Sequence, residues 1–233
     1  MARTLLQLVQ EACSDVGQPR PSVVVSSTVE TPIRMLRLIN KAGRSLIQEV
    51  EFNELLTART FTAVAAQEQV EPPSDYHRMT PHTEIWDVGM KRPVVGPISG
   101  SNWINLTTNT LTGADKYWMF IAGKINIYPA PAVTDDFSYM YQTKNWVVSS
   151  TATAKDSFTA DDDEPRFDDE LLLLELIWRW RAALGIDYAE AMQDAARRKE
   201  MVMAANRARV TQQLSDPFQG ELPDGYWPGR ITG

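Results

Sequence analysis

The spacing of the apolar residues changes twice along the chain, and these changes constrain the fold more than any other feature. Over residues 3–16 and about 31–52, apolar side chains recur every three or four positions, which predicts amphipathic helices. From about residue 57, β-branched and aromatic residues follow a period of two, which predicts strands. Helical spacing returns at about 167–184 and 187–213. We therefore expect an α+β protein: a four-helix bundle with a β-rich insertion between helices two and three.

The same changes divide the chain into four segments. Residues 1–56 hold the first two helices, 57–157 the β-rich insertion, 158–214 a helical hairpin that completes the bundle, and 215–233 an extended C-terminal arm. The amphipathic stripes of the four helices are expected to pack against one another. The residues expected in this bundle core are Ile33, Leu36, Leu46, Val50, Leu174, Ile177 and Trp178.

Capping and turn residues predict where the elements begin and end. Pro32, at a first helical position, makes Thr31 the expected N-cap of the second helix. Gly185 is expected to end the third helix, and Asp187 to cap the fourth. A short extended piece is expected at 23–25. The main expected strands are Glu84–Val88, Pro93–Val95, Tyr117–Ile121, Lys124–Tyr128 and Phe137–Trp146, with a tight hairpin turn at Ala122 and Gly123.

The chain is acidic and has one cysteine. With 30 acidic and 23 basic side chains, its net charge is -7, which disfavours a surface built to hold phosphates. The single Cys13 excludes an intrachain disulfide and a cysteine-based metal cluster, and we expect it on an apolar helix face. The most apolar run, Leu171 to Trp180, is short for a membrane span and is interrupted by charges. We expect no tight nucleic-acid binding and no membrane association.

The sequence contains no phosphate-binding loop, zinc-protease motif, nucleophile elbow or EF-hand. His77 and His82 could in principle join a metal site, but solvated or locally hydrogen-bonded histidines are favoured. The acidic run Asp161 to Glu164 lacks the later ligands of a calcium loop, so we interpret it as a solvated helix start. Trp178 and Trp180 could stack on bases, but their helical spacing favours packing against the second helix. We expect no catalytic residue, metal site or cofactor.

The C-terminal arm is too rich in breakers to form a helix or a core. It holds three prolines and four glycines, yet it keeps several large apolar side chains. A solvated tail would be polar, so these side chains indicate docking onto another surface, with folding back onto the same chain as the alternative. We therefore expect a protein whose function is assembly.

The order of features along nearly the whole chain resembles the head-to-tail adaptor proteins of tailed bacteriophages, the connector family between the portal and the tail. No single stretch is a chemical motif, so the resemblance rests on their order. Pro72-Pro73 stands where such proteins usually carry Leu-Pro. The matching stretches are Leu5-Leu6-Gln7-Leu8-Val9, Glu51-Phe52-Asn53-Glu54-Leu55, Thr60-Phe61-Thr62, Pro73-Ser74-Asp75-Tyr76, Arg92-Pro93-Val94-Val95-Gly96-Pro97-Ile98, Tyr128-Pro129-Ala130-Pro131, and the block from Asp162 to Ala189 with Ile177-Trp178-Arg179-Trp180 inside it.

The resemblance implies a structural virion protein in the neck between capsid and tail, made in the cytoplasm of the bacterial host. Similar proteins form a ring, commonly of twelve subunits, through the helical bundle. The C-terminal segment reaches the portal protein, and the β region faces a tail or nozzle protein. Double-stranded DNA passes through the ring without specific binding. On this chain the portal-binding arm would use Phe218, Leu222, Tyr226, Trp227, Arg230 and Ile231.

Two other classes stay open. One is another neck or tail component, such as a stopper or tail-tube protein, assembled through its β region. The other is a virion enzyme such as a peptidoglycan hydrolase, which is disfavoured because no carboxylate pair stands out in the sequence.

Overall fold

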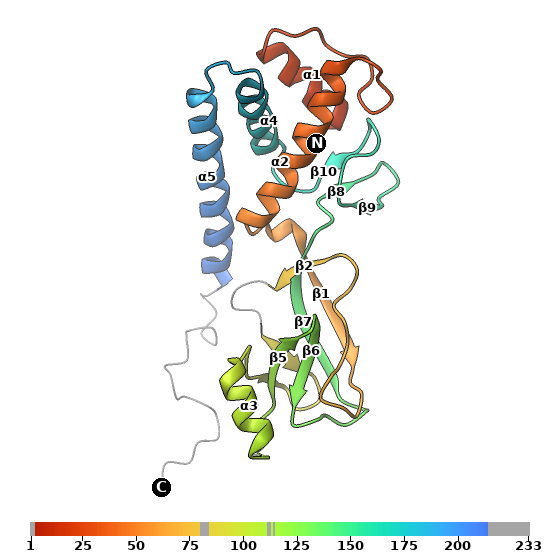
Figure 1. The fold of residues 1–233 in the computed structure, drawn as a ribbon, viewed down its shortest axis with the longest axis vertical. Coiled ribbons are helices and arrows are strands. Elements are labelled where there is room, and N and C mark those ends of the chain that lie inside the picture. Colours follow the sequence, from red (N-terminus) through yellow and green to blue (C-terminus); the bar gives the residue numbers. More distant parts are fainter. Residues whose placement is uncertain (1–2, 80–83, 111–112, 114, 214–233) are drawn as a thin grey trace. The chain divides into compact units, whose positions relative to one another are not determined.

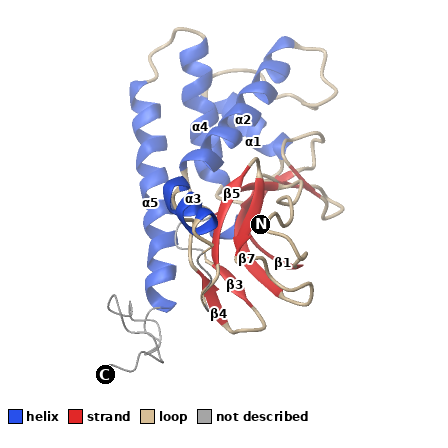
Figure 2. Cartoon of the chain, turned by 60° about the horizontal axis from the view of Figure 1, so that its bottom comes forward, coloured by secondary structure: helices blue, strands red, loops and turns tan. Residues whose placement is uncertain are grey.

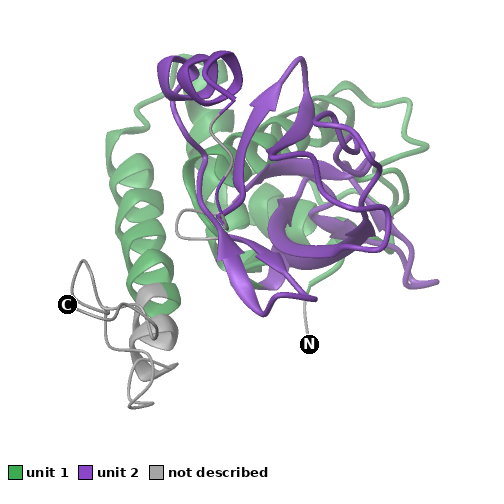
Figure 3. Ribbon diagram, turned by 90° about the horizontal axis from the view of Figure 1, so that it is seen from below, with its two compact units in different colours: residues 1–53, 158–233 green, residues 54–157 purple. Residues whose placement is uncertain are grey.

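The computed structural model describes residues 3–79, 84–110, 113 and 115–213. The chain forms two compact units, which are described separately below (Figure 3). The helical unit consists of residues 1–53 and 158–233, and the β unit of residues 54–157. Helices and antiparallel sheets are both present, so the predicted α+β class is confirmed (Figure 2).

In the helical unit, three helices pack around a fourth. The central helix, α4, lies between α2 and α5 and also contacts α1 (Figure 1). Because α4 has neighbours on several sides, its leucine run is buried almost all round rather than along one stripe. A regular four-helix bundle stays a prediction. The elements are α1 (Leu5–Asp15), α2 (Glu30–Glu49), the short strand β10 (Glu164–Pro165), α4 (Asp169–Ala183) and α5 (Ala189–Gln213).

The residues expected in the bundle core differ in burial. Three are buried, namely Leu46, Val50 and Ile177. Four are half-buried, namely Ile33, Leu36, Leu174 and Trp178. The buried face of α2 runs instead through Met35, Ile39 and Ala42, beside the stripe expected from the sequence.

The acidic run at 161–164 is a folded junction, and its interpretation as a solvated helix start is wrong. The Asp163 side chain is fully buried. Its Oδ2 accepts hydrogen bonds from the backbone N–H groups of Thr159 at 2.8 Å and Ala160 at 2.9 Å. A buried carboxylate is tolerated because these donors replace the water that it loses.

This junction also holds the N-terminal part of the chain. The first N–H groups of a helix lack partners within the helix. Here the N–H of Leu5 donates to the carbonyl of Asp163 at 2.8 Å, and that of Leu6 to the carbonyl of Asp161 at 3.1 Å. The Asp161 carboxylate accepts from the N–H groups of Val24 and Val25. These bonds hold 23–25 in a turn, not in the extended piece that was expected.

Two helix starts also differ from expectation. Helix α2 begins at Glu30, so Thr31 is not its N-cap, and the N-cap residue Val29 makes no side-chain cap. Pro32 lies within the first turn, where its missing N–H removes no helical hydrogen bond. Helix α5 begins at Ala189, two residues after Asp187, which was expected to be its N-cap. The Ala189 N–H donates to Oδ1 of Asp187 at 3.1 Å.

The β unit is built around one long strand, β7. This strand pairs antiparallel with β1 on one side and with β2 and β3 on the other, and β4 extends the sheet beyond β3. Strands β5 and β6 form the predicted hairpin, with the predicted bounds. The elements are η1 (Asn53–Leu55) at the start, then β1 (Leu56–Thr62), β2 (Tyr76–Met79), β3 (Ile85–Asp87), β4 (Arg92–Val94), α3 (Gly100–Thr108), β5 (Tyr117–Ile121), β6 (Lys124–Tyr128), β7 (Asp136–Thr143), β8 (Val147–Val148) and β9 (Ala154–Lys155).

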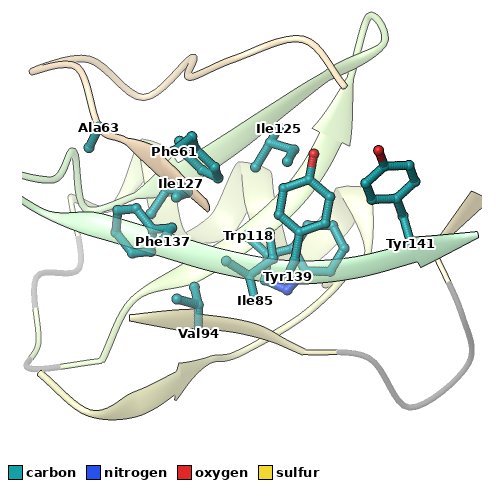
Figure 4. Close-up of a cluster of buried hydrophobic side chains, with 10 residues drawn as sticks. All are labelled: Phe61, Ala63, Ile85, Val94, Trp118, Ile125, Ile127, Phe137, Tyr139 and Tyr141. Atoms are coloured by element: carbon teal, nitrogen blue, oxygen red, sulfur yellow. The ribbon is translucent and has the colours of Figure 1, made fainter. Parts of the chain in front are cut away.

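The core of the β unit lies between this sheet and the hairpin (Figure 4). Gly96 allows a close approach there, because its φ is +153° and a Cβ would clash with the backbone carbonyl of Trp118. The buried cluster consists of Phe61, Ala63, Ile85, Val94, Trp118, Ile125, Ile127, Phe137, Tyr139 and Tyr141.

An ion triad ties the end of β3 to the loops before β5 and β7. The Lys116 ammonium lies 2.7 Å from Oδ2 of Asp87 and 2.6 Å from Oδ2 of Asp135. Burial alone would raise the pKa of Asp87, but hydrogen bonds from Lys116 and the Met90 N–H hold that pKa below its usual value. Burial would lower the pKa of Lys116, but its bonds to both carboxylates raise it.

Replacing Asp163 with alanine should destabilise the helical unit by about 2 kcal/mol, because buried backbone donors lose a charged acceptor. Chemical denaturation followed by circular dichroism measures this loss. The exposed neighbour provides the control: Asp162→Ala should change stability by less than about 0.5 kcal/mol. Equal effects of the two substitutions would contradict the assigned role of Asp163.

The triad should make the stability of the β unit depend on pH. The lowered pKa of Asp87 contributes stability that is full above about pH 4 and is lost as pH falls through the folded-state pKa. The raised pKa of Lys116 contributes stability that is full below about pH 10.4 and is lost above it. Compared with wild type, the double variant Asp87→Asn/Lys116→Met should lose less stability in acid and in strong base. Parallel urea-denaturation profiles across this pH range would rule out the linkage.

Candidate interaction surfaces

The residues expected to carry chemistry do not form a site in the part of the chain that the structure describes. His77 is half-buried in β2, and His82 lies outside the described residues. No group of three or more histidine, cysteine or acidic side chains among the described residues could hold a metal ion. None of the described helices is long and apolar enough to cross a membrane. All six expected arm residues lie beyond residue 213, outside the described residues.

Asp168 positions the two C-terminal helices relative to each other. Its Oδ1 accepts from the Leu171 N–H at 2.7 Å and so caps α4. The Arg198 guanidinium of α5 donates to both carboxylate oxygens, at 3.1 and 2.6 Å. This hydrogen-bonded contact raises the pKa of Arg198. One side chain therefore starts α4 and holds α5 beside it.

Helix α5 buries only a narrow stripe of small residues. Ala191 and Ala195 are its buried side chains among residues 189–206 and allow the helix to approach α4 closely. Further along, Lys199 lies 2.8 Å from the carboxylate of Glu49 at the end of α2. Its hydrogen bond lowers the pKa of Glu49, against the effect of burial. Most side chains at 189–206 are exposed or half-buried.

The connection between α4 and α5 carries a cluster of exposed apolar side chains. Gly185 adopts a φ of +69° there and turns the chain after α4, as predicted. Ile186 is 53% exposed and Met192 is 49% exposed. A shallow groove runs past them along the first turns of α5. We call this cluster, with the exposed carboxylates among it, the turn surface; it consists of Leu184, Ile186, Asp187, Tyr188, Glu190 and Met192.

The two tryptophans of α4 make contacts within the chain. Trp180 is buried, and the Arg34 guanidinium of α2 lies 5.6 Å from the centre of its ring. Trp178 is half-buried, with its ring centre 6.3 Å from that of Tyr188. The Trp178 N–H donates to the Glu175 carboxylate at 2.9 Å. The contact between Trp178 and Tyr188 therefore joins α4 to a residue of the turn surface.

A basic stripe on α2 was not anticipated from the sequence. Arg37, Lys41 and Arg44 are exposed on the face of α2 opposite the buried Ile39. None of the three forms a hydrogen bond or an ion pair with another described residue. The signal that could have revealed the stripe is the spacing of its residues by four and three positions, which is visible in the sequence.

The β unit offers a smaller mixed surface on the outer face of its sheet. Trp86 of β3 and Met140 of β7 are exposed, at 44% and 43%. Trp86 pairs in register with Ser138 of β7, which in turn pairs with Thr60 of β1, so hydroxyl groups interrupt the apolar area. Isolated exposed apolar residues of this kind are common on protein surfaces.

In a comparison with protein families, residues 3–221 match the family model described as SU10 adaptor protein. The match covers both units and reaches the first part of the C-terminal arm. It includes Phe218 but ends before Leu222, so the remaining expected arm residues lie outside it. The comparison with curated proteins gave no match.

Replacing Asp168 with alanine should lower the free energy of unfolding by about 1–2 kcal/mol, because α4 loses its cap and Arg198 loses its partner. Amide hydrogen exchange across 189–206 should also become faster. Asp194→Ala serves as the control, because it removes an exposed ion pair with Arg197 within α5 and should have little effect. Unchanged exchange in α5 after the Asp168 substitution would show that other contacts hold this helix.

Proposed function

The chain belongs to the SU10 adaptor protein family, a family of phage head-to-tail adaptors, and we propose from this that it forms the ring that joins the portal to the tail. Its role as a structural adaptor follows from the family, and the observation that carries the proposal is the match over residues 3–221. The ring would stand in the neck of the virion and enclose the channel through which DNA leaves the capsid.

Within this proposal, the C-terminal arm binds the portal. The arm follows α5, whose side chains at 189–206 are mostly exposed or half-buried and so stay open to neighbouring molecules. Large apolar side chains in a segment rich in proline and glycine suit docking into grooves of another protein. A ring presents many arms at once, so weak individual contacts act at high effective concentration and give tight attachment.

The helical unit would contact neighbouring copies, and the β unit would face the tail or nozzle protein. Three exposed cations on α2 without a partner among the described residues, and the exposed apolar groups at the α4–α5 connection, support self-contact through this unit. A net charge of -7 per copy suits a channel from which DNA phosphates are released easily. A ring structure with a strongly basic channel would contradict this last point.

Deleting residues 215–233 should abolish the complex with the portal and leave the rest of the chain folded. The measurement is the native mass of the purified protein, alone and mixed with the portal protein of the same phage. A matched variant keeps the length of the arm and replaces its six anchor residues with serine, which separates loss of side chains from loss of chain. We expect both variants to lose at least about 100-fold in portal affinity, as hot-spot removal does.

A portal complex that survives the deletion would instead favour a stopper or tail-tube component assembled through the β unit. Absence of any complex between the full-length chain and the portal would overturn the adaptor proposal. Circular dichroism of each variant shows whether the helical and β units are still folded.

A further inference from the structure

The basic stripe on α2 is unfavourable in an isolated subunit. With a rise of 1.5 Å per residue, Arg37, Lys41 and Arg44 follow one another at about 6 and 4.5 Å along the helix. Like charges at these spacings destabilise a helix by a few tenths of a kcal/mol per pair. No acidic side chain occupies a position three or four residues away from any of them. An anionic partner from outside the helix would relieve this repulsion.

Other cations of the helical unit already have such partners. Arg3 pairs with Asp169, Arg198 with Asp168, and Lys199 with Glu49. No ion pair among the described residues joins a carboxylate of this unit to the stripe. The chain as a whole carries seven more acidic than basic groups, so another copy offers carboxylates in excess.

The turn surface has the complementary character. Asp187 and Glu190 are exposed and form no ion pair with any described residue. They stand among the exposed side chains of Ile186, Tyr188 and Met192, so the turn surface combines apolar groups with acidic ones. Apolar groups with charges at their rim are typical of a protein interface, whereas a surface for duplex DNA would be uniformly basic.

We propose that the basic stripe of one copy docks on the turn surface of the next copy. The alkyl stems of Arg37 and Lys41 would cover the apolar side chains, and their charged ends would reach Asp187 and Glu190. The two surfaces differ, so the contact is heterologous and generates a closed ring when the rotation between copies closes. The inference rests on the proposed function, because it names the contact between copies of the adaptor ring.

A charge exchange between the two surfaces tests the contact. Lys41→Glu and Glu190→Lys should each reduce self-assembly at least about tenfold, because each places like charges opposite one another. The double variant should recover most of the assembly, because it restores the attraction in reverse. Lys144→Glu is the matched control, since it makes the same charge change on an exposed side chain of the β unit. Sedimentation velocity of the full-length chains, alone and with the portal, measures assembly.

Covalent trapping gives a second readout that does not depend on affinity. The double variant Lys41→Cys/Glu190→Cys, treated with a short bismaleimide during assembly, should form a ladder of covalent multimers. Each single variant should stay monomeric or form chance dimers. The native Cys13 is buried, and burial raises the pKa of its thiol, so it contributes little background.

The outcomes separate this inference from the proposed function. One outcome is that the wild-type chain assembles with the portal, the single charge variants assemble normally, and no covalent ladder forms. This outcome would overturn the docking contact and leave the adaptor function standing. Failure of the wild-type chain to assemble under any condition would overturn both. Normal assembly of Lys41→Glu with loss of binding to a fluorescent DNA duplex would assign the stripe to DNA and overturn the contact between copies.

Discussion

The buried carboxylate of Asp163 is the interaction on which the helical unit depends. It orders the loop at 159–163, and the carbonyl groups of that loop then bind the free N–H groups at the start of α1. A few residues later, Asp168 starts α4 and holds Arg198 of α5. Three helices from opposite ends of the chain are therefore positioned by one acidic segment. The β unit can be inserted between α2 and α4 because this segment, rather than a short loop, joins the two halves of the helical unit.

This organisation explains why α2 and α5 have exposed side chains that the proposed assembly contacts can use. Helix α4 is covered by its neighbours and has little surface to offer, whereas α5 touches it through a narrow alanine stripe. The same feature leaves the turn surface open at one end of α5, while the other end leads into the C-terminal arm. In an adaptor, one helix would thereby connect the contact between copies to the contact with the portal.

Some charged groups of this chain are paired with nearby partners, and others are left unpaired on particular surfaces. Some of the acidic side chains form contacts within the chain. They cap helices, order the junction at 161–163 and pair with Lys116 in the ion triad. Among the described residues of the helical unit, three exposed cations on α2 and the two exposed carboxylates of the turn surface form no ion pair. A net charge of -7 alone would suggest a uniformly acidic surface, and it conceals this separation. The separation matters because complementary patches orient partners as well as attract them.

The sequence by itself determined the fold class, the helices on either side of the β region and the hairpin of β5 and β6, because hydrophobic periodicity and turn residues act locally. Helix α3 was not predicted, because its glycine, asparagine and threonine residues are poor helix formers. Its signal in the sequence was the N-cap residue Ser99. Only the tertiary structure decided that Asp163 is buried and that Arg37, Lys41 and Arg44 have no partner among the described residues. Both properties depend on which groups, distant in the sequence, come within hydrogen-bonding distance. The spacing of residues along the chain does not predict these partners.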